Sequence, residues 1–235
     1  MIPEELVQVP VAKLDREYKS REKLLEARVK LPLAIRLDGV GFSKALIGFA
    51  EPRDVRVHKA IVEAASEIVK RFSASGAYVA SDEINVLLLG PSLPYAGRLQ
   101  KLVSISAALA SSSTSLALGR TLLFDARVVP LEGVDDAKRY VLYRARIALN
   151  NYVGRVLRKI TVKSLKPPSL REQLELLREL GINIGEKPVW EWAGTSIYWS
   201  VSAAGKRVLK HCDGPDGLLK ALERYRSPEL SSLSK

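Results

Sequence analysis

The chain has 235 residues, a formal net charge of +11 and an isoelectric point of about 9.8, and hydrophobic residues make up 47% of it. This composition excludes wholesale disorder and predicts one large domain, or one core with a smaller appendage. The basic charge favours a polyanionic partner such as a nucleic acid, although a basic surface without a binding role is the alternative.

The rare residue types exclude several classes of protein. Cys212, His58 and His211 are too few for a disulfide framework or a His/Cys zinc cluster. We expect no apolar stretch long enough to span a bilayer, and the acidic start lacks a signal-peptide pattern, so we expect a cytoplasmic protein. The scarcity of Asn, Gln and Met beside many charged residues is typical of a heat-adapted source, although compositional drift produces the same pattern.

The N-terminal half predicts a charged helical segment over residues 11–30, followed by alternating strands and helices. The predicted elements are a strand over 31–37, a helix capped by Asp54 that runs to Phe72, a hairpin over 77–89, a helix over 95–118 and a strand over 122–129. This order of strand, helix, strand, strand, helix, strand is the ferredoxin-like split unit. The predicted fold class is therefore α+β, with an antiparallel sheet and two helices.

The C-terminal half predicts a helical lobe with one short strand. Its predicted elements are a long helix from Asp135 to about Lys163, a helix capped by Ser169 that ends at Gly181, a strand over 194–201 and a frayed polar tail after Ser227. We place the boundary between the two parts at residue 130, so that 1–130 form the first domain and 131–235 form the lobe, with roles in RNA binding and oligomerisation.

The long helix has an unusual charge pattern. From Ala137 to Arg171 the chain contains many Lys and Arg residues but no Asp or Glu. Like charges at four-residue spacing weaken a helix, and a structural helix normally mixes signs on its solvated face. The pattern therefore favours a face that follows phosphate groups, with an ordinary solvated face as the alternative.

Two acidic turns are the strongest candidates for a functional site. Asp38-Gly39 ends one apolar run, and Ser81-Asp82-Glu83 lies between two others. A carboxylate at the end of a buried strand is costly to desolvate unless a cation meets it. The intervening helix is expected to make the strands neighbours, which suits two Mg²⁺ ions about 3.5–4 Å apart. Each motif alone also fits an ordinary turn.

The residues after the first acidic turn suit a phosphate group. No Walker A loop or dinucleotide fingerprint occurs in the chain, and neither histidine lies in a convincing Ser/His/Asp pattern. Gly39 and Gly41 are expected to let backbone N–H groups approach a triphosphate. The nearest cations for its charge are Lys44, Arg98 and Lys101, each of which also fits a plain surface position.

Taken in order, these residues resemble the tRNA(His) guanylyltransferase family and its archaeal and bacterial relatives. The opening block is Ile35-Arg36-Leu37-Asp38-Gly39 and Gly41-Phe42, followed by Phe49, Pro52, Asp54 and Arg56. Ser81-Asp82-Glu83 matches the metal motif of the family. Later blocks are Phe124-Asp125-Ala126-Arg127, Asn150-Asn151 and the segment 194–199. The resemblance covers about residues 30–200.

The resemblance implies a palm domain like that of nucleotide polymerases, working in the 3′-to-5′ direction on the 5′ end of tRNA. ATP activates the 5′ phosphate, and the 3′-hydroxyl of an incoming GTP or other nucleoside triphosphate then attacks it. The resemblance also implies that Asp38, the Gly39 carbonyl and Asp82 bind two Mg²⁺ ions, with Glu83 in the same acidic cluster. Family members are similar in forming homotetramers, built as dimers of dimers.

The resemblance and the charge pattern together assign three sets of residues. The predicted catalytic residues are Asp38, Asp82 and Glu83. The predicted nucleotide-binding residues are Gly39, Val40, Gly41, Phe42, Ser43, Lys44, Ser81, Arg98 and Lys101. The predicted RNA-binding residues are Arg36, Asn150, Asn151, Arg155, Arg158 and Lys159.

Four positions depart from the family pattern. Ala148 stands where the eukaryotic family has a histidine linked to reading the histidine anticodon, Val40 where arginine is frequent, Ser43 where histidine is frequent and Glu51 where lysine is usual. We therefore expect templated repair of truncated tRNA 5′ ends. The alternatives are non-templated addition of G to tRNA(His), another palm enzyme such as a nucleotidyl cyclase, and a non-catalytic RNA-binding protein on the same fold.

Overall fold

One antiparallel sheet forms the centre of the molecule. The computed structural model describes residues 11–21, 27–160 and 169–226. The strands are β1 (Leu33–Val40), β2 (Gly76–Ala80), β3 (Glu83–Leu88), β4 (Leu123–Pro130), β5 (Thr195–Val201) and β6 (Arg207–Asp213). Their order in the sheet is β4-β1-β3-β2-β5-β6, and each neighbouring pair is antiparallel.

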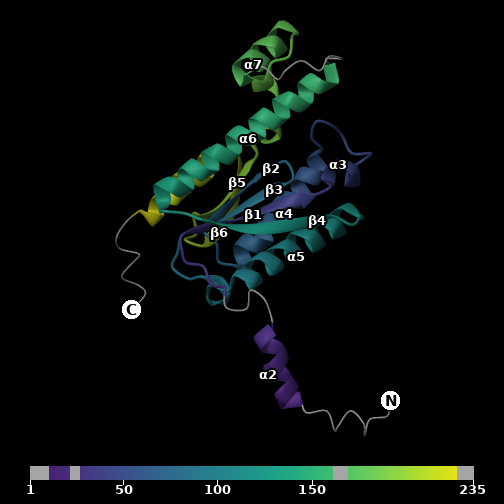
Figure 1. Ribbon diagram of the computed structural model, residues 1–235. Coiled ribbons are helices and arrows are strands. Elements are labelled where there is room, and N and C mark those ends of the chain that lie inside the picture. Colours follow the sequence, from purple (N-terminus) through teal and green to yellow (C-terminus); the bar gives the residue numbers. More distant parts are fainter. Residues whose placement is uncertain (1–10, 22–26, 161–168, 227–235) are drawn as a thin grey trace, which may run out of the picture.

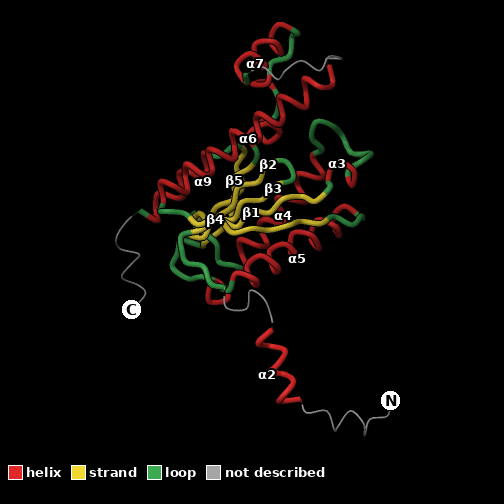
Figure 2. Tube along the Cα trace, viewed as in Figure 1, coloured by secondary structure: helices red, strands yellow, loops and turns green. Residues whose placement is uncertain are grey.

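Helices cover both faces of this sheet. The described helices are α2 (Val11–Arg21), α3 (Phe42–Ala45), α4 (Val55–Arg71), α5 (Leu99–Leu118), α6 (Val134–Ile160), α7 (Leu170–Glu179), α8 (Val189–Ala193) and α9 (Asp216–Leu222). Helices α4 and α5 lie on one face, and the long α6 crosses the other (Figure 1). The strands therefore form a middle layer between helices (Figure 2).

The first four strands with α4 and α5 form the predicted split unit, which confirms the α+β fold class. One expectation about neighbours is wrong. The strand that follows α4 is β2, yet β3 lies between β1 and β2. The connection from β1 through α4 to β2 leaves a gap of one strand between β1 and β2. Strand β3 folds back from β2 and occupies this gap. Asp38 consequently faces Glu83 directly across the ladder.

Alternation along β1 separates the core from the site. Leu33, Ile35 and Leu37 are fully buried in the cluster with α4 and α5. Successive side chains of a strand point to opposite faces, so Arg36 and Asp38 point toward the face that α6 crosses. The same strand thus supplies an apolar face to one layer and charged groups to the other.

The two predicted acidic turns have different structures. Strand β1 continues through Asp38 to Val40, because residues 38–40 pair with β4. The turn predicted at Asp38 is therefore wrong. Ser81 and Asp82 do form the predicted turn between β2 and β3, and Ser81 has a positive φ of 61°. The second motif is a hairpin loop, whereas the first is part of the sheet.

The predicted C-terminal strand forms as β5, but it pairs with β2 and so extends the central sheet. A further strand, β6, then pairs with β5. The predicted helical lobe with one strand thus differs from the structure, since part of 131–235 belongs to the sheet. Strand β6 was not predicted because it lies at the sheet edge and is largely exposed, which obscures its alternation.

Most predicted helices lie close to their expected bounds. The segment predicted over 11–30 is an exception, because its helix α2 ends at Arg21 and residues 27–30 are not helical, with Arg28 in a β-bridge to Arg98. Asp54 caps α4 by accepting from the Arg56 N–H at 2.8 Å, and Ser169 caps α7 in a capping box with Glu172. Helix α6 is continuous over 134–160, and the remainder predicted to Lys163 lies outside the described residues. The same holds for 22–26 and for the tail after 226.

Helix α5 corrects the expectation about membrane spans. Within the described ranges, it is the one helix long and apolar enough to cross a bilayer by length and composition. Its buried residues, among them Leu102 and Ala110, belong to the core between α4 and the sheet. Only 22% of its apolar window is buried, and Leu116 is exposed.

Candidate active site

Three carboxylates form a row across β4, β1 and β3. Asp38 pairs with Asp125 on one side and with Glu83 on the other. Directly paired residues point to the same face of a sheet, so all three lie on the face that α6 crosses. Like charges at such spacing repel, and the row therefore needs cations nearby.

Asp38 carries the least compensated charge of this row. Burial raises the pKa of its carboxyl, and the negative charges of Asp82, Glu83 and Asp125 raise it further. Only Arg36 opposes this effect, with Nη2 3.8 Å from Oδ2 of Asp38. A bound cation at Asp38 would relieve the repulsion.

Glu83 is neutralised inside the protein. Arg144 on α6 donates from Nε to Oε1 of Glu83 at 2.8 Å and from Nη2 to Oε2, and both side chains are only 11–12% exposed. Asn85 donates to the same Oε1 at 2.7 Å and accepts from the Tyr140 hydroxyl at 2.6 Å. Glu83, predicted as catalytic, is therefore placed beside Asp38 but is engaged in anchoring α6 to the sheet.

Asp82 is locked next to β1 by backbone contact. The Gly39 N–H donates to the Asp82 carbonyl at 3.0 Å, and the Ser81 hydroxyl donates to Oδ1 of Asp82 at 2.7 Å. A Cβ at Gly39 would lie 2.6 Å from the Phe42 ring, so glycine leaves room for this ring to pack beneath the strand end. The Gly39 N–H is thus used within the protein and does not serve a triphosphate as predicted.

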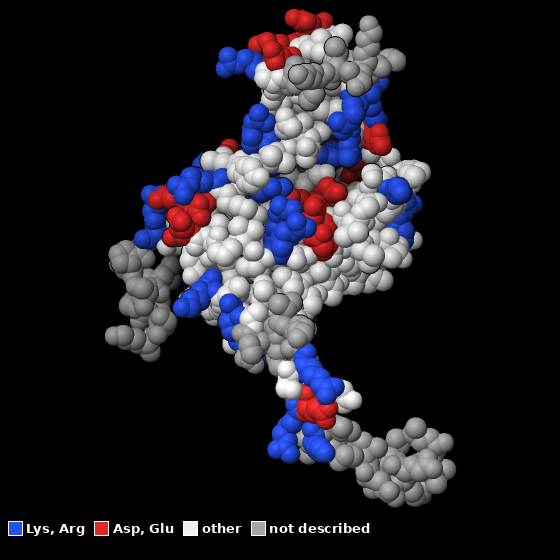
Figure 3. Space-filling model, in the orientation of Figure 1, with Lys and Arg blue, Asp and Glu red and all other residues white. Residues whose placement is uncertain are grey.

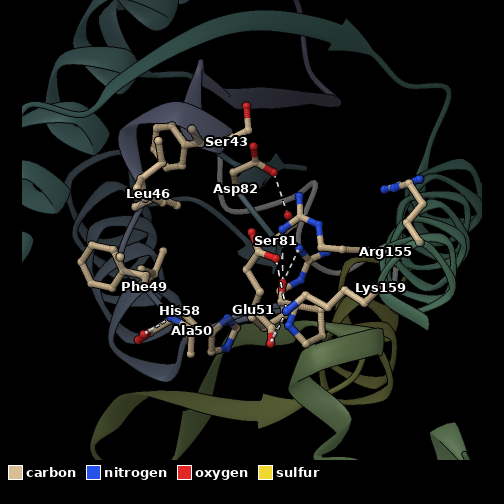
Figure 4. A pocket seen from close by; sticks show the side chains of 18 of the residues that line it. Ser43, Leu46, Phe49, Ala50, Glu51, His58, Ser81, Asp82, Arg155 and Lys159 are labelled. Atoms are coloured by element: carbon tan, nitrogen blue, oxygen red, sulfur yellow. Dashed lines mark hydrogen bonds and ion pairs between the residues drawn. The ribbon is translucent and has the colours of Figure 1, made fainter. Parts of the chain in front are cut away.

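A cavity of about 490 Å³ opens beside Asp82. Its walls are α3 and the loop that follows it, the 81–82 turn, the C-terminal half of α6 and Trp190 on α8. In Figure 4, Arg155 and Lys159 enter from the α6 side, opposite Leu46 and Phe49. Of the predicted residues, the lining includes Phe42, Ser43, Ser81, Asp82, Arg155, Arg158 and Lys159.

The loop on one wall is tied down by three charged residues. Asp54 accepts from the Ala50 N–H at 2.9 Å and pairs with Arg56 at 2.8 Å. Arg120, which follows α5, donates to the carbonyls of Ala45 and Ile47 at 2.7 and 3.1 Å. These contacts give the cavity a defined wall before any ligand arrives.

His58 and Trp190 form the apolar floor of the cavity. Their rings are stacked with centroids 4.6 Å apart, and Nε2 of His58 lies 2.9 Å from the Thr195 hydroxyl. Burial lowers the pKa of His58 to about 4, and the positive charge of Arg53 adds to this. His58 is therefore a neutral ring at pH 7, and its Nε2 is engaged with the Thr195 hydroxyl.

Arg53 and Trp190 are two of the pocket residues that sequence reasoning missed. Burial, with repulsion from Arg155, lowers the pKa of Arg53 to about 10. A single arginine beside the capping Asp54 resembles an ordinary surface cation. Trp190 lies in a short segment without periodicity. The proximity of Pro52 and Asp54, both part of the opening block, was the one signal that pointed to this loop.

Two predicted cations lie far from the cavity. Arg98 and Lys101 stand at the start of α5, where Arg98 bridges to Arg28. That start follows the end of β3 at Leu88, whereas Asp38 and Glu83 pair at the other end of the ladder. Arg98 and Lys101 therefore do not line this cavity, and their contact with a triphosphate stays a prediction. The chain lies at this end of the sheet after β3, and α5 then runs back toward the start of β4, which pairs with Val40.

The remaining predicted nucleotide-binding residues lie beside the cavity but do not line it. Val40 and Gly41 are exposed at the end of β1, and Lys44 is exposed on α3. Gly41 has a positive φ of 66° and begins α3, which turns Phe42 into the core against Phe124. These residues lead the chain from β1 into α3, which forms one wall of the cavity.

The predicted RNA-binding residues divide into two groups. Asn150 and Asn151 are exposed on α6, and Arg158 and Lys159 are exposed near its end. Arg36 instead lies in the sheet, with Nε 3.8 Å from Glu83. Figure 3 shows basic side chains along the upper part of α6 and a mixed acidic and basic group at the middle of the same face.

The donors near Asp38 fit a hard cation. In the described ranges, no three His, Cys, Asp or Glu side chains come close enough to hold a metal ion by themselves. The charges of Asp38 and Asp82 interact, and with the Gly39 carbonyl, which the resemblance implies as a third ligand, they would offer oxygen donors only. Mg²⁺ takes few protein ligands and completes its shell with water and substrate phosphates, which such a set permits.

Comparisons with known proteins agree with this arrangement. A family model described as tRNAHis guanylyltransferase matches residues 15–132, which are 118 of the 235 residues. An uncharacterized protein of Acanthamoeba polyphaga mimivirus is 26% identical over 204 residues, which span 69% of this chain and 68% of that protein.

Solved structures show the same fold at low identity. A bacterial tRNA(His) guanylyltransferase-like protein in complex with ATP is 20% identical with a TM-score of 0.76, over 92% of this chain and 98% of that one. One in complex with GTP has a TM-score of 0.75 at 20% identity, over 91% and 98%. The tRNA(His) guanylyltransferase of Saccharomyces cerevisiae is 18% identical with a TM-score of 0.63, over 86% and 96%.

Proposed function

Because this chain belongs to the tRNAHis guanylyltransferase family, a family of nucleotidyltransferases, we propose that it adds nucleotides to the 5′ end of tRNA in the 3′-to-5′ direction. ATP and GTP or another nucleoside triphosphate are the proposed substrates, and Mg²⁺ is the proposed cofactor. One observation carries the proposal. Asp82 lies at a cavity whose other charged lining is mainly cationic, and Asp38 is held beside it.

The acidic residues have separable tasks in this proposal. Asp38, Asp82 and the Gly39 carbonyl would hold Mg²⁺, which when bound lowers the pKa of the attacking hydroxyl and shields the leaving phosphate. Glu83 would keep Asp38 in position through Arg144 and Arg36. Phosphoryl transfer depends on positioning and charge neutralisation more than on covalent chemistry.

The cavity and α6 would divide the substrates between them. The cavity, about 490 Å³ in volume, suits a nucleotide, with its phosphates directed toward Asp82. The exposed cations near the end of α6, Arg158 and Lys159, would contact the RNA backbone. Such contacts recognise shape and leave the choice of nucleotide to base pairing with the opposite strand.

Templated repair is favoured over G-specific addition by the position of Ala148. This residue occupies the place of the eukaryotic histidine, and it is buried in the cluster beneath α6. A buried methyl group offers no contact to an anticodon. We also propose a cytoplasmic location from the composition and a homotetramer from the family resemblance; light scattering of the purified chain tests the assembly.

The proposed reaction is tested with a tRNA that lacks its first 5′ nucleotide and carries a labelled 5′ phosphate. With Mg²⁺, ATP and each nucleoside triphosphate in turn, we expect extension only by the nucleotide complementary to the opposing base. Asp38→Asn and Asp82→Asn are expected to lower the rate at least 100-fold, on the order of the effect of a lost electrostatic stabiliser. Asp216→Asn, an exposed aspartate on α9, is the matched control.

Each other outcome has a defined meaning. Addition of G regardless of the opposing base contradicts templated repair and supports G-specific addition. Product from GTP without RNA indicates a nucleotidyl cyclase. Retained activity in both aspartate variants refutes the assignment of the acidic site. Binding of tRNA without any extension favours a non-catalytic RNA-binding protein.

A further inference from the structure

The charges that line the cavity do not balance. Two of the acidic residues are already paired: Asp54 with Arg56 at 2.8 Å, and Glu51 with Lys159 at 3.2 Å. In the described part of the chain, the lining arginines have no ion pair, and Asp82 is the one lining carboxylate left to oppose them. These arginines are Arg53, Arg155 and Arg158.

Arg53 is the most confined of these cations. Its Nε is buried without a hydrogen-bond partner, and its Nη1 reaches the Pro52 carbonyl at only 3.4 Å. Arg155 donates to the same Pro52 carbonyl at 3.2 Å, so two guanidinium groups converge on one oxygen. The negative charges that act on Arg53 are Asp82 and Glu191, neither of which forms an ion pair with it. A confined cation without a direct ion pair is costly, because its lost hydration is only partly replaced.

The position of Arg155 separates this site from the outer face of α6. The side chain of Arg155 is half-buried and turns from the helix into the cavity (Figure 4). Arg158 and Lys159 also line the cavity, but they are exposed, so a phosphodiester that follows the helix surface can reach them. Arg53 comes from the loop on another wall and is half-buried. A phosphate at the end of a molecule is the anion that can enter between them.

We infer that Arg53 and Arg155 form a subsite for a terminal phosphate group inside the cavity. The shared chemistry has two sources, the phosphate chain of a nucleoside triphosphate or the 5′-phosphate of the RNA. Guanidinium groups suit both, because they donate parallel hydrogen bonds to phosphate oxygens. The subsite deepens the proposed function and rests on it for the identity of the ligand, whereas anion binding itself can be measured separately.

The first test measures binding of inorganic tripolyphosphate to the full chain by titration calorimetry. Arg53→Gln and Arg155→Gln are each expected to weaken binding at least tenfold, about 1.4 kcal/mol. Arg71→Gln is the matched control, because this exposed arginine ends α4 and lies outside the cavity lining. Unchanged affinity in both cavity variants, or no binding to the unmodified protein, overturns the inference.

Thermal melting without the anion separates a ligand site from a structural role. Loss of the repulsion between Arg53 and Arg155 is expected to leave the melting temperature of Arg53→Gln equal to or above that of the unmodified protein. The rise in melting temperature caused by tripolyphosphate should disappear. If Arg53→Gln melts lower, Arg155→Gln decides the matter, and unchanged affinity in that variant overturns the inference.

Two further pairs of probes identify the source of the phosphate. Loss of the preference for ATP over adenosine in Arg53→Gln assigns the subsite to the nucleotide. Loss of the preference for 5′-phosphorylated tRNA over 5′-hydroxyl tRNA assigns it to the RNA end. Unchanged preferences in both pairs overturn the inference.

The outcomes also separate this inference from the proposed function. If tripolyphosphate binding depends on Arg53 but no tRNA is extended, the subsite stands and the proposed function fails. If Arg53→Gln binds every probe and extends tRNA like the unmodified protein, the function stands and the subsite fails.

Discussion

At the scale of single residues, the cavity sets the charge state of His58. The ring is packed against Trp190, bonded to Thr195 and near the cation of Arg53. Each of these surroundings disfavours the imidazolium form, because burial removes its hydration and a like charge repels it. The pKa falls from 6.5 to about 4, so the ring acts as an aromatic surface rather than a base.

This shift predicts a pH dependence of stability. Between pH 6.5 and about 4, the unfolded chain binds a proton at His58 that the folded chain does not bind. The free energy of unfolding therefore decreases as the pH is lowered from 6.5 to about 4, by up to about 3 kcal/mol. In His58→Gln, urea denaturation at several pH values should show a shallower fall. The Gln side chain keeps a hydrogen-bonding group near Thr195.

The falls are measured relative to pH 8, where the ring is neutral in the folded and unfolded states and its titration does not affect stability. Equal falls in the free energy of unfolding between pH 6.5 and 4 would show that His58 does not determine this part of the profile. The pKa of Asp54 is lowered by its bonds to Arg56, so its contribution to stability is lost only below this pH window.

At the scale of elements, one ion pair connects α6 to the sheet. Arg144 lies on α6 and Glu83 begins β3, and they are separated by 61 residues in the chain. Asn85 and Tyr140 add a second connection between the same two elements. The helix that carries the proposed RNA contacts is therefore fastened at the row of carboxylates, and movement of one would displace the other.

A double-mutant cycle tests this connection. Removal of one partner leaves the other charge poorly solvated, so Glu83→Gln and Arg144→Met should each lower the free energy of unfolding by roughly 3 kcal/mol. The double variant should lose clearly less than the two single losses together, because no charge remains unpaired. Urea denaturation gives the three values.

Additive losses would contradict the pairing. Arg139→Met is a suitable control, since Arg139 is exposed on the same helix and pairs only locally with Asp136 at 3.0 Å. An exposed pair of this kind contributes little, so its loss should change the free energy of unfolding by less than about 1 kcal/mol.

At the scale of the whole molecule, the net charge of +11 is distributed unevenly. The described part of α6 carries acidic residues only in its first turn, and basic residues continue to its end. The cavity opens beside this basic end, so a polyanion attracted to the helix is delivered close to Asp82. The basic surface thus favours binding of a polyanion close to the acidic site.

Salt dependence measures this contribution. Binding of tRNA by the double variant Arg158→Gln/Lys159→Gln should weaken, and the slope of log K against log salt should become shallower by about 1 to 2, because two phosphate contacts are lost. The double variant Lys70→Gln/Arg71→Gln at the end of α4 removes the same charge elsewhere. Equal slopes for the two variants would assign α6 to an ordinary solvated face.

The sequence by itself determined the elements and the acidic motifs. The alternation in β1, the capping residues Asp54 and Ser169 and the Ser81-Asp82 turn are set by neighbours in the chain. Such signals depend on local sterics and on periodic burial, so they are readable before folding is known. The order of these elements was sufficient to predict the split unit, and the family followed from the resemblance of the motif residues.

Only the tertiary structure decided which charges meet. It paired Glu83 with Arg144, turned Arg155 toward Arg53, and placed Lys101 at the far end of the sheet. It also added β6 to the sheet. The physical reason is that electrostatic energy depends on distance in space and on burial, and residues remote in sequence acquire both only when the layers pack.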